Sequence, residues 1–315
     1  MTAELLAREQ GSFGGPWRAL TVRRLELGDF RNYRQLALSP RSGPIVLYGE
    51  NGAGKTNLLE AVSMLSPGRG LRSAKLAEAD RAEGGSWRLR AEIDSPVGLV
   101  EIRSAHDPDM GRRTVVADDR DLRSQNALGE FVSLLWLTPA MDRLFAEGAS
   151  GRRRFLDRLV LALDPHHAAR VAAFERALRE RSHLLRAGRR DPAWLKAVEQ
   201  RMAEAAVAVT AARRELVAEL DAELAQAHFP FPRPRLTLLG EVESWLETQP
   251  AVEVEQRLVE ALAAGRDEDA ATGGASVGPN RSDLVAVDAL RGEAAARCST
   301  GRQKAYLISI VLAEA

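Results

Sequence analysis

The first half of the chain is dominated by an alternation of apolar and polar residues that predicts β-strands. The alternation covers residues 20–38, with a turn at Gly28-Asp29, and returns over residues 86–117. The apolar run at residues 45–48 and the stretch Leu134 to Thr138 predict two further buried strands. Residues 1–19 lack a period and contain several glycines, so we expect a loose extension there.

Beyond residue 150 the apolar spacing becomes helical. Apolar residues recur at three- and four-residue intervals over residues 171–185 and at near-heptad intervals over residues 195–224. A short turn at residues 188–192 joins them, which predicts an antiparallel pair of helices. Residues 264–282 are rich in glycine, aspartate and alanine and show no period, so we expect a linker that returns the chain to its first domain.

These patterns predict an α/β fold with two domains. Residues 20–150 and 276–315 would form the first domain, and residues 151–275 would form an inserted α-helical arm. Lys+Arg 44 and Asp+Glu 44 cancel in the whole chain, but residues 152–190 contain eleven Arg and four acidic residues, whereas residues 241–269 contain nine acidic residues and two Arg. Any binding of nucleic acid must therefore use a local patch.

The composition also restricts the cellular compartment. The single cysteine, Cys298, excludes an intramolecular disulfide framework and a Cys-rich zinc module. No apolar run has membrane length, and Glu4, Arg8 and Glu9 stand where a signal peptide would need apolar residues. We therefore expect a cytoplasmic protein with no membrane association.

The clearest motif in the chain follows the apolar run at residues 45–48. It reads Gly49-Glu50-Asn51-Gly52-Ala53-Gly54-Lys55-Thr56 and fits G-x-x-x-x-G-K-[ST], the P-loop, between a predicted strand and a predicted helix. Backbone N–H groups of such a loop and of the following helix bind phosphates. Lys55 would add a positive charge for the β- and γ-phosphates, and the Thr56 hydroxyl would bind Mg²⁺. The sequence therefore predicts a site for ATP and Mg²⁺.

A second motif narrows the class of P-loop protein. Cys298-Ser299-Thr300-Gly301-Arg302-Gln303-Lys304 precedes an apolar helical stretch and resembles the S-x-G-x-[QK]-[KQ] signature of ABC-type ATPases. In those ATPases the serine hydroxyl and the glycine N–H bind the γ-phosphate held by a second subunit. Ser299, Gly301, Gln303 and Lys304 are thus candidates for a site completed in trans, and the alternative is that Ser299 only caps a helix.

With these two motifs in place, residues 20–315 resemble the RecF family of bacterial recombination mediators. The motifs that carry the resemblance are Asp29-Phe30-Arg31-Asn32-Tyr33, the P-loop followed by Asn57-Leu58-Leu59-Glu60-Ala61, Arg152-Arg153-Arg154-Phe155-Leu156-Asp157, Gly278-Pro279-Asn280-Arg281-Ser282-Asp283-Leu284, and the signature. The resemblance implies a P-loop ABC-type ATPase head with an inserted α-helical arm, and it implies that Arg31, Asn32 and Asn57 lie near the nucleotide.

For function, the resemblance implies an ATP-dependent homodimer in recombinational repair and replication of DNA. Such a protein binds double-stranded DNA and junctions of single- and double-stranded DNA near gaps, works with RecR and RecO, and helps to place RecA on single strands. Arg152, Arg153 and Arg154 are candidates for contact with the DNA backbone, which is read through its charge. The alternative is that they form a solvated start of a helix.

Two departures from the family limit these expectations. Asn280 stands where the family has histidine, so we carry over no role that needs an imidazole. After the signature helix the family continues with an apolar strand ending in Asp-Glu, the Walker B motif, and with the D-loop, and neither is present before Ala315. We therefore expect severely impaired ATP hydrolysis and leave enzymatic activity open. A truncated reading frame or an assembly-edge fragment would explain this end.

Two other functions stay open at this point. One is a nucleotide-binding subunit of another ABC-type ATPase, such as a transporter, which the long separation of Lys55 and Ser299 disfavours. The other is a catalytically inactive fragment that senses nucleotide.

Overall fold

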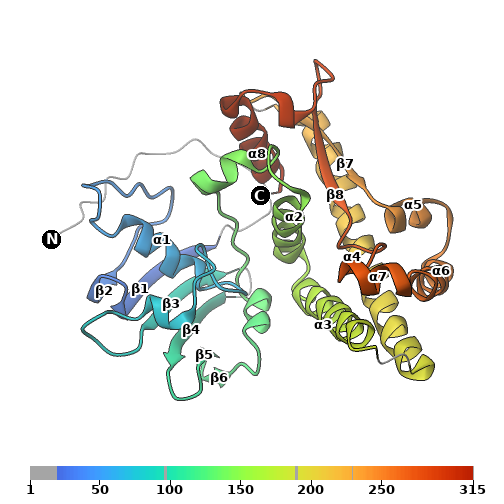
Figure 1. Cartoon of the computed structure of the whole chain (residues 1–315). Coiled ribbons are helices and arrows are strands. Elements are labelled where there is room, and N and C mark those ends of the chain that lie inside the picture. Colours follow the sequence, from blue (N-terminus) through green and yellow to red (C-terminus); the bar gives the residue numbers. More distant parts are fainter. Residues whose placement is uncertain (1–19, 96–97, 189–190, 229, 315) are drawn as a thin grey trace. The chain divides into compact units, whose positions relative to one another are not determined.

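The computed structural model describes residues 20–95, 98–188, 191–228 and 230–314 (Figure 1). The chain divides into two compact units, Met1–Trp136 and Leu137–Ala315, which are called here the first and the second unit. The extension predicted for residues 1–19 lies outside the described residues.

The first unit is built on a six-stranded antiparallel sheet with the order β2-β1-β3-β4-β5-β6. Its strands are β1 (Thr21–Phe30), β2 (Tyr33–Leu38), β3 (Arg88–Ser95), β4 (Gly98–Asp107), β5 (Arg112–Ala117) and β6 (Arg120–Asp121). The strands predicted from alternation are therefore confirmed. The turn lies at Arg31-Asn32 instead of Gly28-Asp29, because β1 continues to the fully buried Phe30, which pairs with Tyr33.

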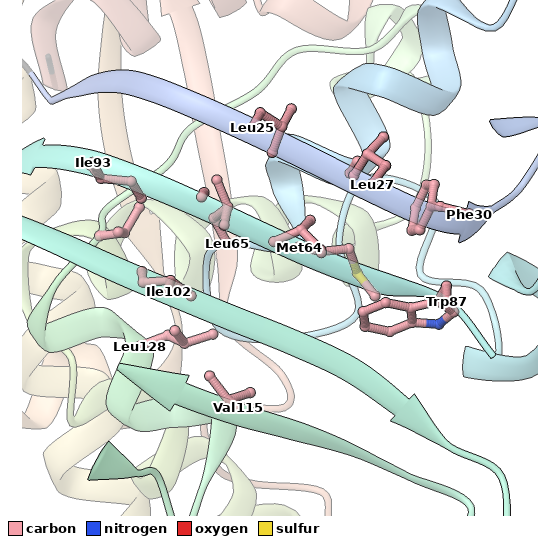
Figure 2. Close-up of a cluster of buried hydrophobic side chains, with 14 of the residues drawn as sticks. Leu25, Leu27, Phe30, Met64, Leu65, Trp87, Ile93, Ile102, Val115 and Leu128 are labelled. Atoms are coloured by element: carbon pink, nitrogen blue, oxygen red, sulfur yellow. The ribbon is translucent and has the colours of Figure 1, made fainter. Parts of the chain in front are cut away.

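One face of this sheet forms an apolar core with the helix α1 (Lys55–Ser63) and the residues after it. The register pairs Leu25 with Ala91 on β3, so alternate residues of neighbouring strands share this face. Figure 2 shows Met64 and Leu65, which follow α1, beside the strands of the sheet. The short 3-10 helices Leu76–Ala79 and Gln125–Glu130 complete the regular structure of the unit.

The prediction of two further buried strands is wrong for this structure. Residues 45–48 and 134–138 lie outside both described sheets, and Ile45 and Val46 are exposed. An apolar run becomes a strand only where a neighbouring strand pairs with its backbone. The apolar pattern at these residues indicates a preference for the strand conformation, but it does not indicate whether another strand lies beside them.

The second unit is mainly helical (Figure 1). Its helices are α2 (Ala149–Leu163), α3 (His167–Arg186), α4 (Pro192–Gln226), α5 (Glu241–Thr248), α6 (Ala251–Ala264), α7 (Arg266–Thr272) and α8 (Thr300–Glu314), with 3-10 helices at Pro139–Arg143 and Ala295–Arg297. The predicted pair of long helices is confirmed as α3 and α4, which pack against each other. β7 (Pro234–Leu239) and β8 (Asp283–Asp288) pair in antiparallel fashion.

The linker predicted without structure at residues 264–282 is wrong in part, because α7 lies there. Asp269 on α7 is fully buried, and its carboxylate accepts hydrogen bonds from Arg181 Nη1 at 2.7 Å and from the backbone N–H of Ser276 at 2.9 Å. Arg181 Nε also donates to the fully buried Glu199 at 3.0 Å. Buried charges need such partners. The ion pairs give a fixed place to a segment that has no apolar period.

The predicted division into domains stays a prediction. It assigns residues 276–315 to the head and residues 151–275 to the arm. In the second unit β8, from the first of these ranges, pairs with β7, from the second. The elements of both ranges therefore share one compact unit.

Candidate nucleotide site and signature element

The P-loop lies directly before α1 in the first unit, as the motif requires. Gly49, Gly52 and Gly54 have φ angles of 141°, 86° and 98°, in the region that favours glycine. Gly54 precedes α1, and no side chain in the described part of the chain caps the helix there. The first-turn N–H groups of α1 are therefore available to an anion.

A close approach fixes Gly54 against the turn between β1 and β2. A Cβ atom at Gly54 would lie 2.6 Å from Tyr33 Oη and 2.7 Å from Asn32 Nδ2, so a larger residue does not fit. Asn57 Nδ2 donates to Asn32 Oδ1 at 2.8 Å. The structure thus brings the predicted residues Asn32 and Asn57 together with the P-loop.

Lys55 and Thr56 are the first two residues of α1. Lys55 Nζ donates to the carbonyl oxygens of Gly49 at 2.8 Å and Glu50 at 2.7 Å. A phosphate group must replace these two hydrogen bonds, and the exchange is favourable because charge-assisted hydrogen bonds are stronger than neutral ones. Thr56 is exposed, as are Glu50, Asn51 and Gly52 of the loop. These four predicted ligands therefore face solvent, whereas Gly54 is buried.

Arg31 is directed at the body of α1. Its Nε and Nη2 atoms donate to Glu60 Oε2 at 2.9 Å and Oε1 at 2.6 Å. Arg72 Nη1 donates to Glu60 Oε2 at 2.8 Å, and the Glu60 side chain is only 3% exposed. A buried carboxylate with two arginine partners holds α1 in place. Contact between Arg31 and ATP stays a prediction.

The signature residues form the start of α8 in the second unit. Ser299, Thr300 and Gly301 are exposed there. The carbonyl oxygen of Ser299 accepts the backbone N–H groups of Arg302 at 3.0 Å and Gln303 at 2.9 Å, which closes the first turn. The hydroxyl of Ser299 and the backbone of Gly301 therefore lie at an exposed helix start.

The other two candidates of the signature point to protein atoms. Gln303 is buried, and its Nε2 donates to the carbonyl oxygen of Cys298 at 2.9 Å. Lys304 is exposed, with Nζ 3.3 Å from Asp142 Oδ2. Gln303 thus fixes the loop beneath Ser299.

Two motifs far apart in the sequence meet in the second unit. Arg152 Nε and Nη2 donate to Asp283 Oδ1 at 2.6 Å and Oδ2 at 2.9 Å. Arg153 Nη1 donates to the carbonyl oxygen of Ser282 at 2.8 Å. Arg154 is exposed. Two of the three DNA candidates are therefore held within the protein, and Arg154 faces solvent.

Asp157 joins the same two motifs through Arg213. Arg213 Nε and Nη2 donate to Asp157 at 2.8 and 2.9 Å, while Arg213 Nη1 donates to the carbonyl oxygen of Pro279 at 2.8 Å. His167 Nε2 lies 2.8 Å from Asp157 Oδ1. Burial alone would raise the pKa of Asp157, but the hydrogen bonds from His167 and Arg213 outweigh it and lower the pKa. Asp157 is thus a charged structural residue.

Comparison with known proteins identifies the family. Residues 45–313 match the family described as AAA domain, putative AbiEii toxin, Type IV TA system. The chain is 47% identical to the DNA replication and repair protein RecF of Mesorhizobium japonicum, over 93% of this chain and 79% of that protein. It is 45% identical to RecF of Rhizobium meliloti, with the same coverage. This chain belongs to the RecF family.

Solved RecF structures show the same fold. The recombination mediator protein RecF of the RecFOR pathway, solved as RecF-ATPrS, matches with a TM-score of 0.82 at 19% identity, over 94% of this chain and 80% of that chain. The structure described as RecF-ATP matches with a TM-score of 0.81 at 20% identity, over 95% and 81%. The predicted α/β fold, an ABC-type ATPase head with an α-helical arm, is confirmed. Among the described helices, none is long and apolar enough to cross a membrane.

Sequence reasoning on this RecF-family chain missed the residues that support α1 from beneath. Glu60 lies in the motif Asn57-Leu58-Leu59-Glu60-Ala61, but no supporting role was predicted for it, and Arg72 and Arg113 lie outside every motif. Arg113 on β5 donates to four uncharged oxygens after α1 or on β4, those of Met64, Ser66, Gly68 and Ser104. Burial lowers the pKa of Arg113 to about 10, and a cation near a helix carboxyl terminus is favourable. One signal was present, because Arg113 shares its strand face with the buried Val115 and Ala117.

Proposed function

We propose that this chain is an ATP-dependent DNA-binding protein of recombinational repair, which binds DNA near single-strand gaps and assists the loading of RecA. RecF-family membership supports the role in DNA repair. One observation carries the ATP-dependent part, namely the packing of Asn32 and Tyr33 against Gly54 of the P-loop. Two separate motifs of the family thus lie together at the start of α1, which supports their joint role at a phosphate site.

Mg²⁺ fits this site as an ion shared between protein and nucleotide. Thr56 is exposed at the start of α1, and the described residues contain no group of three or more His, Cys, Asp or Glu that could hold a metal. Mg²⁺ is usually bound by one or two protein groups together with water and substrate phosphates. We therefore assign Thr56 as its protein ligand. The bound ion would neutralise phosphate charge.

A second copy of the chain would complete the site. Ser299 and Gly301 lie exposed at the start of α8, where a hydroxyl and backbone N–H groups favour an anion. The γ-phosphate on the P-loop of one copy would bind these groups of the other. ATP should therefore promote pairing of two chains, and ADP should not, because ADP lacks the bridging phosphate.

The DNA contact would be electrostatic. Of residues 152–154, Arg154 is the one that faces solvent. We therefore assign the contact between this segment and the phosphate backbone of DNA to Arg154 alone. Double-stranded DNA, its junctions with single strands, and the partners RecR, RecO and RecA are proposed on the basis of family membership.

Replacement of Lys55 tests the nucleotide site. We expect Lys55→Ala to weaken ATP binding at least about tenfold, because it removes the charge placed for the β- and γ-phosphates while the loop glycines remain. Calorimetric titration with Mg²⁺-ATP measures the affinity. Lys75→Ala is the matched control, since Lys75 is an exposed lysine of the same unit outside the P-loop. Unchanged ATP affinity in a folded Lys55→Ala protein would disprove the assignment.

A further inference from the structure

The start of α8 rests on a buried carboxylate outside every motif. Asp288 is the last residue of β8 and is 2% exposed. Tyr306 of α8 is fully buried, and its hydroxyl donates to Asp288 Oδ2 at 2.5 Å. Arg302 Nε lies 3.0 Å from the same oxygen as an ion pair. One carboxylate oxygen therefore contacts two side chains of the first turns of α8.

The second oxygen of Asp288 holds the turn that follows β8. Oδ1 accepts the backbone N–H groups of Leu290 and Arg291, both at 2.9 Å. Burial alone would raise the pKa of Asp288. The hydrogen bond from Tyr306, the two N–H groups and the charge of Arg302 outweigh burial and lower the pKa. Asp288 is thus a carboxylate that joins the end of β8 to α8.

Tyr306 extends this connection to the signature loop. Its Oη lies 3.6 Å from Cys298 Sγ, and the carbonyl oxygen of Cys298 accepts the Gln303 side chain. Cys298 directly precedes Ser299. A continuous line of contacts therefore runs from Asp288 through Tyr306 to Cys298, the residue before Ser299. A shift of Tyr306 would displace that loop.

Burial of the polar side chains in this line costs free energy of desolvation, and this cost is useful only if the side chains fix the geometry of their surroundings. A carboxylate, a guanidinium and a phenol hydroxyl must all lose water to meet at Asp288, whereas apolar residues would fill the same space without that loss. What the polar set supplies is direction, because hydrogen bonds fix the angle and distance between groups. The exposed first turn of α8 is the part that needs a fixed direction.

We propose that Asp288 is a positioning residue for the signature: through Tyr306 and Arg302 it sets the start of α8 so that Ser299 and Gly301 can bind a γ-phosphate held by a second copy of the chain. This inference rests on the proposed ATP-dependent pairing. It names residues that do not touch the nucleotide and act through α8.

Three single variants separate positioning from general stability. Asp288→Asn removes the charge but keeps an oxygen for the turn, and Tyr306→Phe removes only the hydroxyl. Ser309→Ala is the matched control, because Ser309 is a fully buried residue of α8 whose hydroxyl donates to the carbonyl oxygen of Pro232 at 3.1 Å, away from the signature. All three lose a buried hydrogen bond or charge contact of the same helix.

The readout is self-association of the whole chain by sedimentation with ATP and with ADP. We expect Asp288→Asn and Tyr306→Phe to weaken ATP-dependent association about tenfold, the effect of one lost charge-assisted hydrogen bond. Ser309→Ala should associate as the wild type does, and the ATP affinity of the single chain should be equal in all four proteins. Wild-type association in Tyr306→Phe and Asp288→Asn, or an equal loss in Ser309→Ala, would overturn the inference.

Hydrogen exchange on the unpaired chain tests the inference without pairing. In Asp288→Asn and Tyr306→Phe, the amides of residues 299–303 should exchange about tenfold faster, while those of residues 308–314 keep the wild-type rate. If the wild type does not associate with ATP, the proposed pairing fails. Unchanged exchange at residues 299–303 overturns the positioning role whether or not pairing occurs.

Discussion

The helices α1 and α8, whose first turns carry residues of the P-loop and of the signature motif, are held in place by opposite arrangements. α1 carries its own anchoring charge, Glu60, which accepts hydrogen bonds from arginines outside the helix. The anchor of α8, Asp288, lies on the strand before it and contacts side chains of the helix. In both cases the carboxylate is buried, and the first turn of the helix carries exposed residues, Thr56 in α1 and Thr300 and Gly301 in α8. A buried charge fixes the helix while its N–H groups stay available to an anion.

The difference decides how much of each helix depends on its anchor. Glu60 is in the middle of a short helix, and its loss leaves two arginines without their carboxylate. Asp288 contacts only the first turns of α8, and Ser309 anchors the helix further along. Damage at Glu60 should therefore spread over α1, whereas damage at Asp288 should stay near the signature.

The largest effect is expected for Glu60→Gln. An amide cannot neutralise Arg31 and Arg72, so the local stability of α1 should fall by about 2 to 4 kcal/mol. Hydrogen exchange of peptides covering residues 55–63 measures the loss. Glu78→Gln, an exposed glutamate of the same unit, is the control and should leave α1 unchanged. Equal exchange of α1 in Glu60→Gln and wild type would contradict a role for Glu60 as the anchor of this helix.

A smaller effect is expected for Arg154→Glu, which tests the exposed charge of the second unit. DNA affinity should fall about three- to tenfold, and the slope of log affinity against log salt should decrease by about one, because one phosphate contact is lost. Fluorescence anisotropy over a range of salt concentrations measures both quantities. Arg235→Glu changes the charge by the same amount at an exposed residue of β7 and serves as the control. The same slope in both variants would place the DNA elsewhere.

The smallest effect concerns the other end of α8. Burial and the neighbouring charge of Glu219 raise the pKa of Glu314 to about 7. The folded chain then binds more protons than the unfolded chain, so the contribution of Glu314 to stability is fully present below pH 4.5 and is lost as the pH rises through 7.

Glu314→Gln should therefore be more stable than wild type at pH 8, by about 1 kcal/mol after allowance for solvent screening of a part-buried group. The difference should vanish at pH 4.5. Urea unfolding of both proteins at the two pH values gives the comparison. A stability difference that does not change with pH would show that Glu314 titrates normally.

Prediction from sequence succeeded for local patterns. The antiparallel strands of the first unit follow from alternation, and α3 and α4 follow from helical spacing. Residues 45–48 fit a strand equally well and lie outside both described sheets. The apolar run itself does not indicate which strand would pair with it, and this pairing decides whether the run forms a strand.

The residues of the candidate site likewise fall into those that the sequence predicts and those that only the structure reveals. Residues that would touch phosphate, such as Lys55 and Ser299, lie in contiguous motifs and can be found from their spacing. Of the residues that hold those motifs in place, Glu60 lies in a contiguous motif, but Arg72 and Asp288 do not. Asp288 is one acid at the end of one strand, and only the fold shows that Tyr306 reaches it. Likewise α7 becomes ordered through Asp269 and a distant arginine, a pairing that no local period reports.

The ion pair of Arg152 with Asp283 has a consequence for the order of events during synthesis. The two residues are 131 positions apart. A ribosome that adds roughly 5 to 20 residues per second makes Asp283 roughly 7 to 26 seconds after Arg152. α3 and α4 can pack during this interval, because their contacts are close in sequence, while the arginine at the start of α2 still lacks its carboxylate. A translational pause before Asp283 would prolong the exposure of that arginine to cellular polyanions.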